Sequence, residues 1–228
     1  LWISQLSNGT LFFASEVRAL MLARPDRTLR TDMIAEVMQY GYINSPNSAF
    51  NEIHQVPPAS VISWRDGKTT TAAYWTADFE TKVTIPYEEA LETTKELIEA
   101  AVSRRLISER PLGSFLSGGY DSTVVTAYMA KLMKEQVQTY SIGFHSEAFN
   151  EAHYAKQVAN YLGTNHHEEI LSPDPALIIE KISHVLDQPF ADSSIVPTYL
   201  LAKFARENLI VALGGDGGDE VFGGYDRY

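Results

Sequence analysis

The segment of this sequence best suited to chemistry is Ser-Gly-Gly-Tyr-Asp-Ser at residues 117–122, which follows an apolar run and precedes a helical pattern. Because Gly118 and Gly119 carry no β-carbon, the backbone there can turn tightly and approach an oxyanion. The amides at the start of the following helix would point at that anion, and the helix dipole favours negative charge there. Ser117 and Ser122 add hydroxyl donors. The segment therefore predicts a cradle for phosphate groups.

Asp121 does not suit a bare anion site, because its carboxylate would be repelled by a phosphate. Its presence is explained if Mg²⁺ lies between the two, or if Asp121 fixes the loop by accepting backbone amides. The spacing is neither that of a Walker loop, which also needs a lysine, nor that of the Rossmann fingerprint. The plainer alternative is a helix-capping turn with Asp121 or Ser122 as the cap. The position between a strand and a helix favours the phosphate cradle.

A second glycine-rich segment, Gly-Gly-Asp-Gly-Gly-Asp-Glu at residues 214–220, follows the apolar run 209–213. Its glycines allow a ligand to approach the backbone closely. The carboxylates of Asp216, Asp219 and Glu220 would repel one another unless a cation or a basic group of a substrate lies among them. A flexible acidic turn is the alternative. The phosphate-type segment upstream favours a binding role.

These segments need elements that bring them together, and the second half of the chain predicts a parallel α/β sheet. Strands are expected at 112–116, 137–142, 166–171 and 209–213, and helices at 121–134, 151–162, 173–186 and 196–206. Strands that alternate with helices imply a parallel sheet with helices on both faces. Ligands of such sheets bind beyond the carboxyl ends of the strands. The chemistry is therefore expected at residues 117–122, 142–145 and 214–220.

Residues 1–75 have an α+β texture instead. The turn signals Asn8-Gly9 and Asp66-Gly67 adjoin short apolar stretches, which predicts strands at 11–13 and 60–64. A short helix is expected at 31–40, with Thr31 as its cap. We expect the strands of this region to need partners from sequence that precedes the chain.

A linker and a long helix are expected between these two parts. Residues 76–86 show no periodic pattern, and Pro86 marks their end. From Tyr87 the pattern has a period of 3.6, which predicts a helix. One face of that helix carries Leu91, Thr94, Ile98, Ala101, Val102 and Arg105. The expected organisation is therefore a domain at 1–75, a linker at 76–86 and a second domain at 87–228.

Composition restricts the classes of protein and of partner. A chain of 228 residues with 45% hydrophobic content can bury a core, and no apolar run reaches the roughly 20 residues of a membrane helix. A net charge of -11 would repel nucleic acid. We therefore expect small-molecule substrates, with no nucleic acid and no membrane as partners. The absence of cysteine excludes disulfides, thiolate metal sites and cysteine nucleophiles within the chain, and suits a reducing cytoplasm.

Together these segments resemble the ATP-pyrophosphatase superfamily, whose pyrophosphate loop has the form Ser-Gly-Gly-x-Asp-Ser, and within it the glutamine-hydrolysing asparagine synthetases. Leu-Gly-Thr at 162–164 and Gly-Asp-Gly-Gly-Asp-Glu at 215–220 carry the narrower resemblance. Further matches lie at 13–20, 56–58, 74–75, 141–144, 166–168, 189–197 and 222–225. The resemblance covers essentially the whole chain. It implies an adenine nucleotide alpha hydrolase-like fold, preceded by an α+β remnant of an N-terminal nucleophile glutaminase domain.

The resemblance also implies a reaction in two halves. A glutaminase domain with an N-terminal cysteine frees ammonia from glutamine. In the synthetase domain the side-chain carboxylate of aspartate attacks the α-phosphate of ATP, pyrophosphate leaves, and ammonia attacks the aspartyl-adenylate to give asparagine and AMP. Preoriented amides and Mg²⁺ would stabilise the charge on the leaving pyrophosphate. A cytoplasmic ligase that uses ATP and Mg²⁺ is thus expected, and a homodimer of the full-length protein is compatible with this.

By the same resemblance, roles fall on particular residues. Nucleotide binding is assigned to Ser117, Gly118, Gly119, Asp121, Ser122, Ile142 and Gly215. Ile142 would contact adenine through its backbone. Asp216 and Asp219 are assigned to catalysis, near the incoming ammonia or the substrate. The metal ion is assigned to Asp121 and Asp219.

The sequence also departs from the family's pattern. The glutaminase cysteine and the C-terminal helices with their catalytic lysine are absent, and both ends of the chain are expected to be cuts in a longer protein. Gly214 and Asp216 stand where serine is usual and glutamate common, and residues 191–194 lack the arginine of the enterobacterial type. Two alternatives therefore stay open. One is a related ATP-dependent enzyme that amidates a sugar acid or a peptide carboxylate or closes a β-lactam. The other is a nucleotide-binding module without catalysis.

Overall fold

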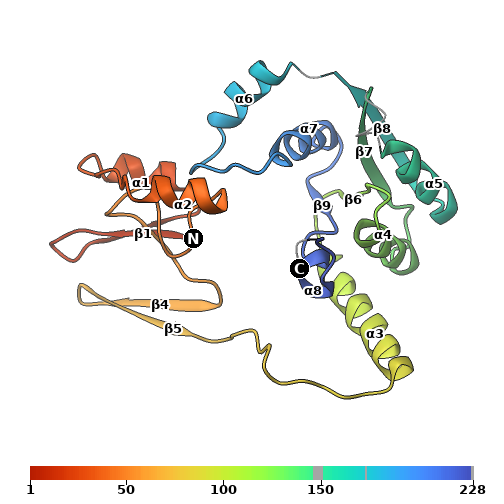
Figure 1. Ribbon diagram of the computed structural model, residues 1–228, viewed down its shortest axis with the longest axis horizontal. Helices are drawn as coiled ribbons and strands as arrows, with labels where there is room; N and C mark the ends of the chain where they lie inside the picture. Colours follow the sequence, from red (N-terminus) through yellow and green to blue (C-terminus); the bar gives the residue numbers. More distant parts are fainter. Residues whose placement is uncertain (146–150, 173, 227–228) are drawn as a thin grey trace. The chain divides into compact units, whose positions relative to one another are not determined.

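The chain forms two compact units in a computed structural model that describes residues 1–145, 151–172 and 174–226. The first unit comprises Leu1–Val83 and Ile179–Ser193, and the second comprises Thr84–Ile178 and Ser194–Tyr228. Figure 1 shows the elements of both. Within the described ranges, no helix is long and apolar enough to cross a membrane.

The first unit combines small antiparallel sheets with two short helices. Its elements are β1 (Trp2–Gln5), β2 (Leu11–Ala14), α1 (Val17–Ala23), α2 (Met33–Tyr40), β3 (His54–Gln55), β4 (Ser60–Arg65) and β5 (Lys68–Ala73). Strand β1 lies between β2 and β3 and is antiparallel to both, whereas β4 and β5 form a separate hairpin. The strands predicted beside the two turn signals are therefore confirmed.

The predicted cap of α2 is wrong. The helix begins at Met33, so that Asp32 rather than Thr31 occupies the N-cap position. The amide of Ile34 donates to the carbonyl oxygen of Thr31 at 3.2 Å, which makes Thr31 part of the turn that leads into the helix. The carboxylate of Asp32 pairs with Arg30 at 2.7 Å instead of capping the helix.

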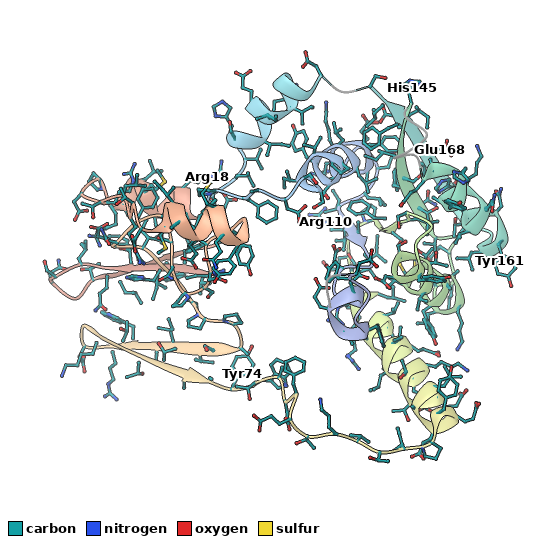
Figure 2. All side chains as sticks on the ribbon, in the orientation of Figure 1. Arg18, Tyr74, Arg110, His145, Tyr161 and Glu168 are labelled. Carbon is teal, nitrogen blue, oxygen red and sulfur yellow. The ribbon has the colours of Figure 1, made fainter. Side chains whose placement is uncertain are left out.

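A segment from the second half of the chain completes the first unit. Asp187 accepts hydrogen bonds from the backbone amides of Val17 at 2.9 Å and Arg18 at 3.4 Å, and so caps α1 from 170 residues away. The side chain of Arg18, labelled in Figure 2, returns to Asp187 at 3.2 Å and to the carbonyl oxygen of His184 at 2.8 Å. The amide of Ala49 donates to the side chain of Gln188 at 2.8 Å. These bonds explain why residues 179–193 belong to this unit.

The second unit is a parallel sheet with helices. Its elements are α3 (Tyr87–Arg105), β6 (Leu112–Phe115), α4 (Tyr120–Leu132), β7 (Gln138–Phe144), α5 (Ala152–Leu162), β8 (Asn165–Leu171), α7 (Ile195–Ala205), β9 (Val211–Leu213) and α8 (Gly218–Phe222). Helix α6 (Pro175–Ser183) runs from this unit into the first. The strand order is β8-β7-β6-β9, and every pair is parallel. The predicted alternation of strands and helices is confirmed, as is the long helix α3.

Helices cover both faces of this sheet because its strands alternate their side chains between them. On one face Leu116 packs against Ala155 and Ala159 of α5. On the other face Tyr140 packs edge-on against Phe204 of α7, with ring centroids 5.4 Å apart. Neighbouring residues of a strand point to opposite faces. The sheet is therefore a buried layer, as a parallel sheet requires.

The direction in which the chain adds strands to this sheet reverses at β6. From β6 the chain moves outward to β7 and β8, and then returns to place β9 on the opposite side of β6. Leu112, Gly113 and Ser114 pair with Val211, Ala212 and Leu213. In open α/β sheets the crevice at such a reversal, outside the carboxyl ends of the strands, is where ligands bind. The segments that follow β6 and β9 are the two glycine-rich segments.

The cap on α1 gives a test of how the first unit is held together. Replacing Asp187 with Ala removes the acceptor for the first amides of α1, and should lower the stability of that unit by about 1–2 kcal/mol. Hydrogen exchange at residues 17–23 in the natural protein measures the loss.

Glu16→Ala is the matched control. Glu16 also forms an ion pair with Arg18, at 3.1 Å, but its side chain is more exposed and makes no cap bond. Its removal should change stability by less than about 0.5 kcal/mol. Equal effects of the two substitutions would contradict the assignment of Asp187 as the cap.

Candidate active site

The first glycine loop, residues 117–122, joins β6 to α4 with a backbone that only glycine permits at one position. Gly118 has a φ of 86°, in the left-handed region that side chains disfavour. A β-carbon there would lie 2.6 Å from Cβ of Tyr154 and 2.7 Å from the amide nitrogen of Ala155. Gly118 is therefore required both by conformation and by its contact with α5.

The serine hydroxyls hold this loop in shape. The hydroxyl oxygens of Ser117 and Ser122 lie 2.8 Å apart, and that of Ser122 accepts the amide of Ser117 at 3.2 Å. The amide of Gly119 donates to the hydroxyl of Ser117 at 3.2 Å. Gly119 is the N-cap of α4, and no side chain caps the helix. The alternative of a capping turn centred on Asp121 or Ser122 is thus wrong, because both residues lie inside α4.

The second glycine loop, residues 214–220, leaves β9 and runs into α8, a short helix that the sequence reasoning missed. Gly217 precedes the helix with a φ of 91°, and Gly223 follows it with a φ of 67°. Asp219 and Glu220 lie in its first turn, where the helix dipole stabilises acidic side chains. Glycines at both ends and acids at the start are the signals that predict such a helix.

The two loops interlock through their glycines. A β-carbon at Gly215 would lie 2.6 Å from the amide nitrogen of Ser122 and 2.7 Å from Cβ of Asp121. A β-carbon at Gly218 would overlap the carboxylate of Asp121. The start of α4 therefore packs directly against the second loop, and the absence of side chains at both glycines permits this approach.

Asp216 folds back over its own loop. A β-carbon at Gly214 would lie 2.6 Å from Oδ2 of Asp216. Glycine at position 214, where serine is usual in the family that the sequence resembles, thus leaves room for this carboxylate. The two departures from the family's pattern are therefore adjacent in space.

A cavity of about 470 Å³ opens where the loops meet. It is lined by Ser117, Gly119, Tyr120, Asp121, Ser122, Gly215, Asp216, Gly217, Asp219, Glu220 and Tyr225. Four of the lining residues carry carboxylates, and no lining residue is a lysine, an arginine or a histidine. A polyphosphate could enter such a cavity only with cations that offset the repulsion.

A second cavity of about 530 Å³ adjoins the first. It shares Ser117, Ser122, Gly215 and Asp216 with the first cavity. The rest of its wall consists of Phe115, Leu116, Ser141, Ile142, Phe144, Glu151, Ala152, Pro197, Thr198, Leu201 and Gly214. This wall is mostly apolar and comes from β6 and β7, from the start of α5, from α7 and from the residue after β9. An elongated ligand can therefore place a polar end in the first cavity and a flat apolar end in the second.

A partly buried histidine lies behind Ser141 in the wall of the second cavity. Nε2 of His166 lies 3.2 Å from the hydroxyl of Ser141, and Nδ1 lies 3.0 Å from that of Thr139. Burial lowers the pKa of His166, and the nearby carboxylate of Glu168 (Figure 2) opposes this shift. The imidazole is therefore neutral at pH 7, with one ring nitrogen as donor and the other as acceptor.

Most of the predicted site residues meet at these cavities. Ser117, Gly119, Asp121, Ser122, Gly215, Asp216 and Asp219 line the first cavity, and Ile142 lines the second. Gly118 lines neither and packs on α5 instead. Sequence reasoning gave no role to Tyr120 or Tyr225, whose hydroxyl donates to Glu220 at 2.7 Å. No sequence pattern distinguishes a tyrosine that lines a cavity from a tyrosine on the surface.

The donors at the first cavity suit a hard divalent cation. Asp121 and Asp219 both line it, and carboxylate oxygens are the ligands that Mg²⁺ prefers. Among the residues that the structure describes, no group of three or more histidine, cysteine or acidic side chains is arranged to hold a metal alone. In nucleotide sites Mg²⁺ is usually held by one or two carboxylates together with phosphate oxygens.

Two known families match different parts of the chain. The model of the asparagine synthase family matches residues 93–228, and that of a glutamine amidotransferase domain matches residues 1–75. The first match covers more than half of the chain. The chain belongs to the asparagine synthase family.

Individual relatives are similar over nearly the whole chain. It is 33% identical to asparagine synthetase [glutamine-hydrolyzing] 1 of Bacillus subtilis, over 97% of this chain and 35% of that protein. It is 32% identical to putative asparagine synthetase [glutamine-hydrolyzing] 2 of Methanocaldococcus jannaschii, over 93% of this chain and 42% of that protein. The chain thus spans between a third and a half of the length of these relatives.

Similarity to solved structures is slight. An NH3-dependent NAD synthetase from Campylobacter jejuni aligns with a TM-score of 0.38 and 16% identity, over 62% of this chain and 61% of that one. A score this low adds nothing to the family assignment.

The interlocked loops predict different outcomes for two glycine substitutions. Gly215→Ala would press a methyl group against the backbone of α4, which cannot yield easily, and should destabilise the second unit by about 1–3 kcal/mol. Gly218→Ala would meet only the carboxylate of Asp121, which can rotate away, and alanine favours a helix over glycine by about 1 kcal/mol.

Thermal unfolding and Mg-ATP binding of the natural protein test this pair. Gly218→Ala should keep a melting temperature near that of the unaltered protein but lose affinity for Mg-ATP, since Asp121 is displaced. Gly215→Ala should lower both. A Gly215→Ala protein as stable as the Gly218→Ala protein would show that the loops do not interlock.

Proposed function

We propose that this chain carries the ATP-binding and acid-activating part of a glutamine-dependent asparagine synthetase. The proposed reaction adenylates the side-chain carboxylate of aspartate with ATP, releases pyrophosphate, and lets ammonia displace AMP to give asparagine. One observation carries the proposal most strongly. The first and second glycine loops, 92 or more residues apart in the sequence, line a single cavity at the carboxyl ends of two adjacent parallel strands.

The first cavity is proposed to hold the phosphates. Its backbone lies close to any ligand, because Gly119 and Gly215 carry no side chain. Amides at the start of α4 face negative charge favourably, and the dipole of a 13-residue helix adds to this. Charge that develops on the departing pyrophosphate would be stabilised by these fixed groups.

The four carboxylates of this cavity decide what must accompany the phosphates. Without a cation, Asp121 and Asp219 would oppose ATP binding. We assign these two residues to Mg²⁺, which would neutralise the phosphate oxygens when bound. Asp216 and Glu220 then remain to meet a basic group, and the ammonium group of an amino-acid substrate is one. We propose Asp216 and Asp219 as the residues nearest to the reacting groups.

The second cavity is proposed to hold the adenosine. Flat apolar rings favour a wall of the kind that Phe115, Ile142 and Leu201 provide. Ile142 lies in β7 beyond its last pair with β6, so the side of the strand that faces away from β8 is available to the edge of a base. The residues shared by the two cavities would then surround the α-phosphate, where the carboxylate of the substrate attacks.

The domain organisation is part of the proposal. We assign residues 1–75 to the C-terminal part of a glutamine amidotransferase domain, 76–86 to a linker and 87–228 to the synthetase domain. Residues 76–86, all of them described, contain neither helix nor strand. The chain has no cysteine, so a cysteine that frees ammonia from glutamine would lie elsewhere in the protein. A cytoplasmic location and a homodimer of the full-length protein complete the proposal, and the lack of cysteine suits a reducing compartment.

The test is pyrophosphate release from Mg-ATP by the natural protein, supplied with ammonia and a panel of carboxylic acids that includes L-aspartate. Release should depend on L-aspartate. Asp121→Asn keeps the size of the side chain but removes its charge, and should lower the rate roughly 100-fold or more. Asp78→Asn, in the exposed segment before α3, should leave the rate unchanged.

The other outcomes each revise the proposal differently. Release with another acid only would keep the adenylation and overturn aspartate as the substrate. No release with any acid, from a folded protein that binds ATP, would leave a nucleotide-binding module without catalysis.

A further inference from the structure

Two buried hydroxyl groups join elements that carry the glycine loops, although they line neither of the cavities. Ser114, in β6, and Thr126, in α4, are both completely buried. Their hydroxyl oxygens lie 2.8 Å apart. Buried polar side chains are retained at a cost unless they are hydrogen-bonded, so this pair needs a structural or functional explanation.

The pair connects the backbone of the first glycine loop with that of the second. The hydroxyl of Thr126 lies 2.7 Å from the carbonyl oxygen of Ser122, which belongs to the first loop. The hydroxyl of Ser114 lies 3.3 Å from the carbonyl oxygen of Leu213, the residue directly before the second loop. The bond from Thr126 to Ser122 is one that a helical threonine forms in many proteins. The continuation through Ser114 to Leu213 crosses 99 residues of sequence and is particular to this fold.

The number of hydrogens restricts what this network can do. Each hydroxyl carries one hydrogen. The hydroxyl of Ser114 can donate it to Thr126, to Leu213 or to the carbonyl oxygen of Phe115 at 3.4 Å, and that of Thr126 can donate to Ser122 or to Ser114. The bond between the two hydroxyls forms only when one of them gives up its bond to a backbone carbonyl. The bonds that Ser122 and Leu213 receive are therefore coupled through this pair.

We infer that Ser114 and Thr126 are positioning residues that set the register between the two glycine loops. This inference rests on the proposed function, because it assigns phosphate binding to one loop and the reacting groups to the other. Binding of ATP needs mainly the first loop and the second cavity. The reaction needs both loops in register, since the substrate carboxylate must reach the α-phosphate in a narrow range of geometry.

Thr126→Val tests the inference, because valine has the shape of threonine without its hydroxyl. In the natural protein it should lower kcat for pyrophosphate release roughly 10- to 100-fold, while the KM for ATP changes by less than about threefold. Thr126→Ser restores the hydroxyl and should bring kcat back to within about threefold of the unaltered protein. A normal kcat in Thr126→Val, together with a lower melting temperature, would show that the network is only structural.

A second substitution shows whether Ser114 and Thr126 affect kcat through one network or independently of each other. Ser114→Ala removes the bridge at the other end and should lower kcat about as much as Thr126→Val. If both act through one network, the double variant should lose no more than about threefold beyond either single variant. Losses that multiply in the double variant would overturn the inference.

A measurement without substrates keeps the inference testable if the proposed reaction fails. Hydrogen exchange at residues 214–220 should be at least about fivefold faster in Thr126→Val than in Thr126→Ser, since the buried hydroxyls join α4 to the residue from which the second loop begins. Unchanged exchange there would overturn the inference even in an active enzyme. Faster exchange in a protein that releases no pyrophosphate would overturn the proposed function alone.

Discussion

The pairing of β9 with β6 is the constraint on which the site depends. Leu213 lies beside Ser114, although the described residues between them form β7, β8 and the four helices α4 to α7. Parallel strands end at the same edge of a sheet, so the segments that follow β6 and β9 must meet there. Neither glycine loop encloses a cavity by itself. The cavity exists because the sheet brings the two together.

Close backbone approach then converts this meeting into a usable site. Gly118, Gly215 and Gly218 each lie where a β-carbon would collide with a neighbouring element. The cavity that results is strongly acidic, with Asp121, Asp216, Asp219 and Glu220 in its wall. Acidic walls and a phosphate cradle conflict unless cations are present. Under the proposed function the site would bind ATP only as its magnesium complex, and the carboxylate of Asp216 would face the amino-acid substrate.

Local patterns predicted most of the fold and of the site. The alternation of strand-like and helical segments predicted every strand of the parallel sheet, including β8, although most residues of β8 are polar. The Ser-Gly-Gly-Tyr-Asp-Ser segment identified the first glycine loop, because glycines between a strand and a helix allow a ligand to approach the backbone and serine hydroxyls can donate hydrogen bonds to it. Within the family resemblance, the acidic glycine segment identified its partner.

Features that depend on distant contacts were not predictable in this way. Asp187 caps a helix 170 residues earlier in the chain, and nothing near Asp187 indicates this. Ser114 and Thr126 read as ordinary strand and helix residues until the sheet brings Leu213 beside them. The start of α2 was misplaced because Arg30 engages Asp32, a contact that capping preferences do not include. Each miss comes from a tertiary interaction that overrides a local preference.

The most direct test of the central claim is exchange of labelled pyrophosphate into ATP, measured on the natural protein with Mg²⁺ and L-aspartate but without ammonia or glutamine. If the two loops form one site for adenylation, the label should enter ATP only when the acid is present, because only reversible formation of the adenylate returns pyrophosphate to ATP. Formation of ADP and phosphate without exchange would contradict the account, since it would mean that the γ-phosphate rather than the α-phosphate reacts in this cavity.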